Sequence, residues 1–303
     1  MTAELIDGKK LAADVRERLK MEIAAGQGED LPVLAVVMVG ENDASRIYVR
    51  NKQKAAAEIG MVCEVYEFAE SIGERALMSS LQDLNDNPHI NGIIVQQPLP
   101  EHIDPLKILA VIDPAKDVDG FSPTNLGLLA TKEPQAIVAA TPKGVLQLLQ
   151  NTGQELAGRH AVIIGRSNIV GRPLAMLLLN QDCTVTVCHT KTRNLAEIVR
   201  QADIVVAACG CARLVKADWI KDGATVIDVG INRVEGKLCG DVDFDAVKEK
   251  AAYLTPVPGG VGPMTVAMLL ENTWEAAQRQ FREGKAGSAA GHGHHCSCGH
   301  CRS

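Results

Sequence analysis

Residues 160–173 read HAVIIGRSNIVGRP, and this stretch decides the expected fold. An apolar strand, His160–Ile164, runs into Gly165, and a helical pattern, Leu174–Leu179, follows Pro173. Glycine at a strand end lets backbone amides approach a phosphate, and the N-terminus of the next helix attracts an anion. The stretch therefore predicts a dinucleotide site in a Rossmann-like domain.

The residue at position 167 weakens this motif when it is taken alone. Ser167 stands where the G-x-G-x-x-G fingerprint has its second glycine, so the turn also fits a protein that binds no nucleotide. The next expected strand is followed by HTKTR, without the acidic residue that usually holds the ribose of NAD. Thr190, Lys191 and Arg193 are instead suited to a 2′-phosphate, with Arg166 beside them. NADP is therefore favoured over NAD.

Strand-like and helical patterns alternate on both sides of this stretch, which is typical of parallel strands joined by helices. Aromatic residues make up 3% of the 303 residues, so the core depends on aliphatic side chains, as such sheets require. The fold class is therefore α/β, with two α/β domains flanking a cleft and the second domain Rossmann-like. The expected strands are 33–39, 62–68, 90–96, 160–164, 184–188, 203–207 and 225–229, and the expected helices include 45–59, 74–85 and 141–149.

The domain boundaries follow from the same alternation. Residues 1–140 are expected to form the first domain and residues 141–264 the second, while a helix over 265–283 packs back on the first. Residues 284–303 are rich in Gly, Ala and Ser and then in His and Cys, too polar and too small-sided to build a core. This segment is expected to be a disordered tail.

Charge and hydropathy exclude several classes of partner. The net charge of −6 is spread along the chain without a basic stripe, which argues against nucleic acid. Residues 1–10 lack the apolar segment of a signal peptide, and no apolar run is long enough to span a bilayer. The cysteines outside the tail are scattered, as expected for small core residues in a reducing compartment. We therefore expect a cytoplasmic protein without a membrane partner.

Three polar residues share one face of the expected helix 45–59. Ser45, Tyr48 and Lys52 lie just beyond the carboxyl end of strand 33–39, where open α/β sheets bind ligands. The same spacing also fits a solvated helix surface. Tyr-x-x-x-Lys occurs in short-chain dehydrogenases as well, but in that family the pair follows the glycine-rich turn instead of preceding it.

Two further polar clusters follow in the same domain. Gln96 comes directly after an apolar strand, and residues 116–121 read KDVDGF. Taken singly, the glutamine fits a strand cap and the Asp-rich loop fits a turn. Their occurrence together with the polar helix face favours a catalytic site.

With these motifs the chain resembles the bifunctional methylenetetrahydrofolate dehydrogenase/cyclohydrolase family. The resemblance covers nearly the whole chain except the tail. Gln97 departs from the family pattern, which commonly has Leu there, and Ala139-Ala140 stand in place of Pro-Cys, but neither change removes a residue with a chemical role. The matching segments are Ile6–Lys9, Val39–Lys52, Gly92–Pro100, Lys116–Phe121, Thr141–Gly144, Gly165–Pro173, Asp228–Gly230, Gly240–Val242 and Thr255–Thr265.

The resemblance implies oxidation of 5,10-methylenetetrahydrofolate to 5,10-methenyltetrahydrofolate with NADP, and then hydrolysis to 10-formyltetrahydrofolate. It places Asp119 where both carboxylate oxygens accept hydrogen bonds from the edge of the pterin, and Tyr48 where it orients the ring system. A cationic substrate favours the neutral form of a nearby lysine. The resemblance therefore implies that Lys52 acts as base and then as acid, with Gln96 fixing its orientation.

The resemblance also implies the remaining contacts and a homodimer. No metal is expected in the active site. The expected substrate-binding residues are Ser45, Tyr48, Pro98, Leu99, Asp119 and Gly260. The expected cofactor-binding residues are Gly165, Arg166, Ser167, Ile169, Val170, Thr190, Arg193, Gly210 and Ile231.

The tail concentrates side chains that bind transition metals. Thiolates and imidazoles at such spacing bind zinc, nickel or copper(I), although a structural zinc site usually has two separated pairs of ligands. A neutral extension explains the same residues equally well. The candidate ligands are His292, His294, His295, Cys296, Cys298, His300 and Cys301.

Two rival functions each fit part of the sequence. A metal-binding protein on a retired dehydrogenase scaffold would have lost Lys52, Gln96 or Asp119, but all three are present. A monofunctional NAD-dependent dehydrogenase would have an acidic residue after strand 184–188 and would not need Lys52. The bifunctional enzyme is therefore favoured.

Overall fold

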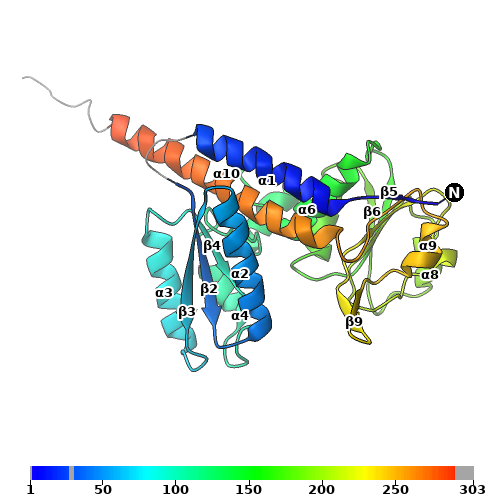
Figure 1. The fold of residues 1–303 in the computed structure, drawn as a ribbon, viewed down its shortest axis with the longest axis horizontal. Coiled ribbons are helices and arrows are strands. Elements are labelled where there is room, and N and C mark those ends of the chain that lie inside the picture. Colours follow the sequence, from blue (N-terminus) through cyan, green and yellow to red (C-terminus); the bar gives the residue numbers. More distant parts are fainter. Residues whose placement is uncertain (1, 27–30, 291–303) are drawn as a thin grey trace, which may run out of the picture.

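The computed structural model describes residues 2–26 and 31–290, and it arranges them around two parallel β-sheets (Figure 1). Two long helices, α1 (Gly8–Ala25) and α10 (Val261–Ala290), pack against each other along the molecule. Within the described part of the chain, no helix combines the length and the apolar character needed to cross a membrane.

The central strand of the first sheet is buried on both faces. β2 (Val33–Val39) lies between β3 (Val62–Phe68) and β4 (Gly92–Val95), and all pairs are parallel. Because the two following strands lie on opposite sides of β2, its carboxyl end is a topological switch point, where open sheets bind ligands. The helices that follow these strands are α2 (Asp43–Glu58), α3 (Glu74–Asp86), α4 (Pro105–Val111) and α5 (Pro123–Ala130).

The second sheet has its switch point at β5 (His160–Ile164). β5 lies between β6 (Thr184–Cys188) and β7 (Ile204–Ala207), again with parallel pairing. The sheet order is β1-β11-β8-β7-β5-β6. The remaining elements of this half are β8 (Thr225–Asp228), β11 (Tyr253–Leu254), the hairpin β9 (Asn232–Val234) and β10 (Lys237–Cys239), the helices α7 (Gly171–Leu179), α8 (Leu195–Val199) and α9 (Phe244–Lys248), and the short 3₁₀ helix η1 (Ala217–Trp219).

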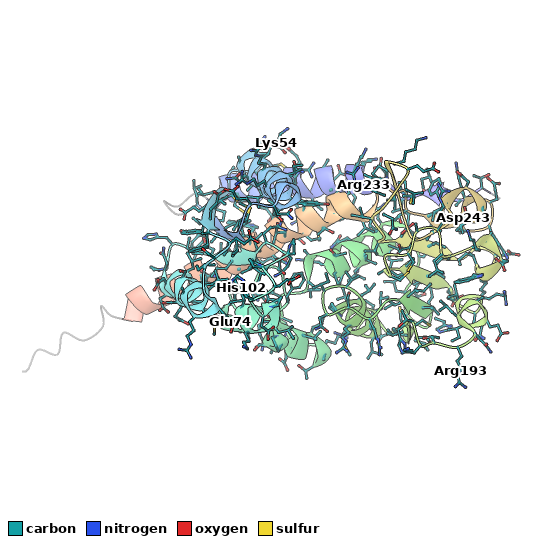
Figure 2. The ribbon with its side chains drawn as sticks, turned by 90° about the horizontal axis from the view of Figure 1, so that it is seen from below. Lys54, Glu74, His102, Arg193, Arg233 and Asp243 are labelled. Atoms are coloured by element: carbon teal, nitrogen blue, oxygen red, sulfur yellow. The ribbon has the colours of Figure 1, made fainter. Side chains whose placement is uncertain are left out.

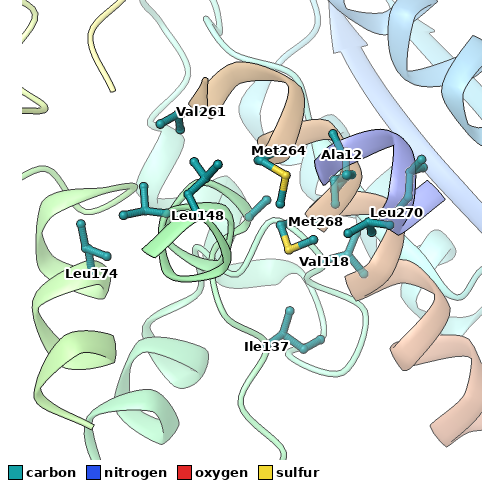
Figure 3. Close-up of a cluster of buried hydrophobic side chains, with 14 of the residues drawn as sticks. Ala12, Val118, Ile137, Leu148, Leu174, Val261, Met264, Met268 and Leu270 are labelled. Atoms are coloured by element: carbon teal, nitrogen blue, oxygen red, sulfur yellow. The ribbon is translucent and has the colours of Figure 1, made fainter. Parts of the chain in front are cut away.

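Helices at the junction of the two sheets share one apolar core. α6 (Ala140–Asn151) packs against α10 and against α7 of the second half. Figure 3 shows the core at this point, with Ala12 of α1, Leu148 of α6, and Met264 and Met268 of α10. Because the same cluster contains buried residues of β2 and of β5, the apolar core joins both sheets.

The α/β fold expected from the sequence is confirmed, and the expected strands agree with the observed strands within two residues. β1 (Glu4–Leu5) was not expected, because two residues are too few to show a period. It pairs with β11 of the second sheet, although it precedes every strand of the first.

The last helix is longer than the sequence pattern predicted. α10 begins at Val261, with Pro263 in its first turn, where a missing amide hydrogen costs nothing. It continues to Ala290, seven residues into the segment that the sequence analysis assigned to the tail. The alanines of this segment favour helix more than its composition as a whole suggested. Residues 291–303, with the candidate metal ligands, lie outside the described residues.

Candidate functional site

Lys52 and Gln96 meet at the carboxyl end of the first sheet. Lys52 lies on α2, the helix that follows β2, and Gln96 is the first residue after β4. Because β2 and β4 are paired in the sheet, the two side chains meet at its carboxyl end. Lys52 Nζ donates a hydrogen bond to Gln96 Oε1 at 3.1 Å. Gln96 Nε2 donates to the carbonyl oxygen of Gln97 at 2.8 Å, and the Gln96 amide donates to Val37 O at 2.8 Å. These bonds fix the Gln96 side chain with its carbonyl oxygen toward the lysine.

Ser45 and Tyr48 lie on α2 within two turns of Lys52. The helix is capped by Asn42, whose Oδ1 accepts from the Ser45 amide at 3.0 Å. Ser45 is buried, and its Oγ donates to Gln97 O at 3.4 Å. Tyr48 is 54% exposed, which leaves its ring available to a flat ligand. The helix face predicted from the spacing is therefore directed to the segment after β4 at two of its three positions.

Asp119 reaches the same region on the loop after α4. Ile93 N of β4 donates to Lys116 O at 2.7 Å, which sets the loop beside that strand. Burial raises the pKa of the Asp119 carboxyl to about 6, the Lys52 ammonium lowers it, and Asp117 raises it further. Lys52 and Asp119 are thus close enough to interact electrostatically.

Lys116 and Asp117, which carried no role in the sequence analysis, build the Asp119 loop. Lys116 is buried, and its Nζ donates to the carbonyl oxygens of Asn85 and Asn87 at 2.6 and 2.7 Å, at the end of α3. Asp117 Oδ2 accepts from the amide of Ser122 at 2.8 Å. These two residues bind protein groups, whereas no hydrogen bond of the Asp119 carboxylate is found within the described part of the chain.

The turn after β5 explains why the glycine fingerprint is incomplete. Gly165 has φ +132°, and a Cβ there would collide with Ala208 O. A Cβ at Gly171 would collide with Gly165 O, so the start of α7 packs closely on the turn. Ser167 Oγ accepts from the Val170 amide at 3.2 Å. Ser167 therefore stabilises the turn with a hydrogen bond in the place where the fingerprint has a glycine.

Most of the other expected cofactor residues are exposed, and they follow β5, β6, β7 and β8. Ile169 is 48% exposed and Ile231 is 60% exposed, so both side chains are accessible to a ligand. Arg166, Thr190 and Arg193 are exposed as well, and Figure 2 shows Arg193 projecting from the surface. The turn, the apolar side chains and the basic side chains together fit a dinucleotide.

Two buried aspartates, Asp228 and Asp241, bind backbone amides of the loops around this site, and the sequence analysis gave neither a role. Asp241 Oδ2 accepts from the amides of Cys209 and Gly210 at 2.7 and 2.9 Å, so it holds the loop after β7. Asp228 accepts from the amides of Gly230 and Asp241 at 3.0 and 2.9 Å. Burial raises the pKa of Asp228 to about 6, and the backbone hydrogen bonds oppose that rise. The family motifs around both residues were the signal that could have found them.

The remaining expected substrate residues lie in different surroundings. Pro98 is exposed and Leu99 is half-buried, both directly after Gln97. Gly260 is buried, and a Cβ on Gly8 of α1 would collide with Gly260 O. Gly260 is thus placed at the junction of the two sheets, against the start of α1.

The two departures from the family pattern are accommodated differently. Gln97 is half-buried, and its Nε2 has no hydrogen-bond partner among the described residues. Ala139 and Ala140 are buried at the start of α6 and add no polar group. Gln97 is the departure that changes the polarity beside Lys52 and Gln96.

Comparison with known families matches both halves of the chain. Residues 6–119 match the catalytic domain of tetrahydrofolate dehydrogenase/cyclohydrolase. Residues 139–281 match the NAD(P)-binding domain of the same enzyme. The second match begins at the start of α6 and includes most of α10.

Individual relatives agree with the family match. The "bifunctional protein FolD" of Halalkalibacterium halodurans is 52% identical over 92% of this chain and 100% of its own length. The crystal structure of the bifunctional methylenetetrahydrofolate dehydrogenase/cyclohydrolase of Campylobacter jejuni has a TM-score of 0.89, with 47% identity over 92% of this chain and 99% of that one. The Trypanosoma brucei enzyme, solved with NADP and an inhibitor, has a TM-score of 0.88 and 42% identity over 93% of this chain and 99% of that one.

The electrostatic coupling of Asp119 to Lys52 can be tested by titration. Lys52→Met is expected to raise the pKa of Asp119 above its value of about 6, because it removes the cation that stabilises the carboxylate. The measurement is ¹³C NMR of protein labelled at aspartate, with Asp119→Asn to assign the resonance. Lys54→Met, at an exposed position of α2, is the control and should leave the pKa unchanged. An unchanged pKa in Lys52→Met would show that the two groups do not interact.

Proposed function

The chain belongs to the tetrahydrofolate dehydrogenase/cyclohydrolase family and has both of its activities, and from this premise we propose that one site on the first sheet serves both reactions. The first reaction oxidises methylenetetrahydrofolate, and the second hydrolyses the methenyl product. Both act on the same carbon of the same folate. The observation that carries the proposal is the 3.1 Å hydrogen bond between Lys52 and Gln96, with Asp119 close enough for Lys52 to lower its pKa.

In the hydrolysis, Lys52 moves the proton. Water adds to the methenyl carbon, and Lys52, which the bound cationic substrate favours in its neutral form, takes a proton from that water. The resulting ammonium gives its proton to the N5 nitrogen, the bond from this nitrogen to the carbon breaks, and the hydroxyl proton passes to solvent as the formyl group forms. The net change consumes one water and releases one proton. Gln96 orients Lys52, because its own amide is fixed on Gln97 O.

Substrate binding rests on Asp119 and Tyr48. The Asp119 carboxylate would accept hydrogen bonds from the N–H groups of the pterin edge, which pair with a carboxylate in two places. Tyr48, on the exposed face of α2, packs against the ring system. In the oxidation these residues position the methylene carbon, a step that depends on alignment more than on an acid or base.

We propose NADP as the preferred cofactor. When bound, it accepts the hydride from the methylene carbon. The turn at Gly165 and the start of α7 suit its pyrophosphate. The basic and hydroxyl side chains after β6, with Arg193 among them, suit its 2′-phosphate. The similar T. brucei enzyme was solved with NADP.

We also propose that the enzyme is a homodimer. In the described part of the chain, β3 is an outer strand of the first sheet and is seven residues long. An outer strand of this length presents unpaired backbone groups to a second copy of the chain.

The fourth proposal concerns residues 291–303, which lie beyond the family match that ends at residue 281. The H. halodurans protein matches 279 residues of this chain, which is its whole length. The remaining residues include three cysteines and four histidines in ten positions. We propose that they bind a thiophilic divalent or monovalent metal, with no part in the folate reactions.

Lys52→Met is expected to lose cyclohydrolase activity by about 10²-fold or more, because the proton carrier is gone. Dehydrogenase activity should fall much less, since hydride transfer needs no base. A stopped assay measures reduced nicotinamide directly and total product after acid conversion to the methenyl form. Lys54→Met is the control and should keep both activities. Full hydrolysis by Lys52→Met would contradict the assigned role.

Arg193→Ser is expected to raise the KM for NADP about tenfold, because a charge-assisted hydrogen bond to the 2′-phosphate is lost. The KM for NAD should stay unchanged. Arg75→Ser, at an exposed position of α3, is the control. An equal rise for both dinucleotides, or a wild-type enzyme that prefers NAD, would contradict the NADP proposal.

Metal binding by the tail is tested by competition with a zinc indicator under reducing conditions. The full chain should withdraw zinc from the indicator, and a chain ending at Ala290 should not. Both should have the same dehydrogenase activity, which shows that the shortened chain is folded. If the two chains compete equally, the metal does not bind to the tail.

A further inference from the structure

Asn272, on α10, makes one buried and two partly buried hydrogen bonds to segments far apart in the chain. Its side chain is 1% exposed. Its Nδ2 donates to Val118 O at 2.9 Å and to Val138 O at 2.8 Å. Its Oδ1 accepts from Lys143 Nζ of α6 at 3.0 Å. Every donor of this amide group is therefore used, and two of the three bonds restrain loops of the first half.

The orientation of Asn272 is itself fixed by ion pairs among three helices. Lys143 is 16% exposed and lies 2.9 Å from Glu271 Oε2 and 2.9 Å from Glu275 Oε1, both on α10. Glu271 is 7% exposed and also pairs with Arg18 of α1. Partly buried pairs of this kind hold their geometry more firmly than pairs on an exposed surface. The ion pairs hold Lys143 in place, and Lys143 in turn fixes the Oδ1 end of the Asn272 side chain. The Nδ2 end must then point at the carbonyl oxygens of Val118 and Val138.

The hydrogen bond from Asn272 to Val118 O acts on Asp119 because of where Val118 lies in the chain. Val118 immediately precedes Asp119, so the bond to its carbonyl oxygen sets the peptide that carries the Asp119 carboxylate. On the other side of Asp119, Gly120 has φ +68° and packs against the chain at Ala139, whose neighbour Val138 is the second acceptor of Asn272. One amide thus fixes Asp119 relative to the segment on which its loop packs.

We propose that Asn272 is a positioning residue for folate binding, which acts by holding the Asp119 loop at the distance that the pterin requires. The inference rests on the proposed role of Asp119 as the folate anchor. Asn272 does not touch the folate. Displacement of a substrate-binding group by a fraction of an ångström weakens binding of the substrate and of its transition state alike, so the effect falls on KM more than on kcat.

Asn272→Ala is expected to raise the KM for methylenetetrahydrofolate about tenfold, with kcat within about threefold. The KM for the dinucleotide should not change, because the hydrogen-bond partners of Asn272 are Val118, Val138 and Lys143, none of which is in the proposed dinucleotide site. A second variant, Asn272→Asp, keeps the size of the side chain and the partner Lys143 but puts an oxygen against both loop carbonyls. Asn272→Asp should likewise raise the KM for methylenetetrahydrofolate with little change in kcat. It provides the test if Asn272→Ala does not fold.

The matched control is Thr273→Val, at the next position of α10. Thr273 is fully buried, and its Oγ1 donates to Leu269 O within its own helix at 2.9 Å. The control therefore loses a buried hydrogen bond without losing a contact to the Asp119 loop. It should lower Tm and leave the folate KM unchanged. If Asn272→Ala lowers Tm in the same way and leaves the folate KM within about twofold, Asn272 is a structural residue only and the inference is overturned.

Asp119→Asn separates this inference from the function on which it rests. If Asn272 acts through Asp119, adding Asn272→Ala to Asp119→Asn should raise the folate KM little further. Additive effects of the two changes would overturn the inference while leaving the Asp119 anchor in place. If Asp119→Asn alone leaves the folate KM unchanged, the anchor role fails first and the inference fails with it.

Discussion

The packing of α10 between α1 and α6 is the constraint on which the rest of the structure depends. The two sheets have their own switch points, at β2 and at β5, and each switch point creates a place for one ligand. Hydride transfer requires the two ligands to lie in contact. The shared apolar core, which includes Met264 and Met268, joins the two sheets in one arrangement. The ion pairs of Glu271 with Arg18 and Lys143 fix how α10 is oriented against α1 and α6.

Three buried aspartates of the described residues bind protein groups, whereas the half-buried Asp119 is the one proposed to bind a ligand. Asp117, Asp228 and Asp241 each accept backbone amides and hold loops beside a site. Asp119 has the same burial-raised pKa as Asp228 but no comparable set of amides to stabilise its charge. Its stabilising neighbour is Lys52, which also faces the carbon to be hydrolysed in the proposed mechanism. The proposed folate anchor and the proposed base therefore influence each other's charge.

Elements that leave a pattern in neighbouring residues could be predicted from the sequence, whereas features that depend on contacts between distant residues could not. Parallel strands such as β2 and β5 were predicted because long apolar runs indicate burial on both faces. Lys52 and Gln96 were predicted because each follows a strand of the same sheet, and the family motifs added Asp119. β1 was missed because it has two residues, and Ser167 looked like a defect until its bond to Val170 was seen. Asn272 could not be predicted, because its partner Val118 lies 154 positions away and an asparagine in a helix has no pattern of its own.

Contacts made by the first and last elements of the described chain also determine when during translation the fold can be completed. The first strand, β1, finds its partner β11 about 250 positions later, and the loop that carries Asp119 is tied down by a residue of the last helix. A nascent chain that has emerged through residue 260 can form most of both sheets, but it has neither the brace for that loop nor the helix that joins the two halves. The translating ribosome therefore holds a chain with exposed apolar helix faces until α10 emerges, and chaperones are expected to shield it during that interval.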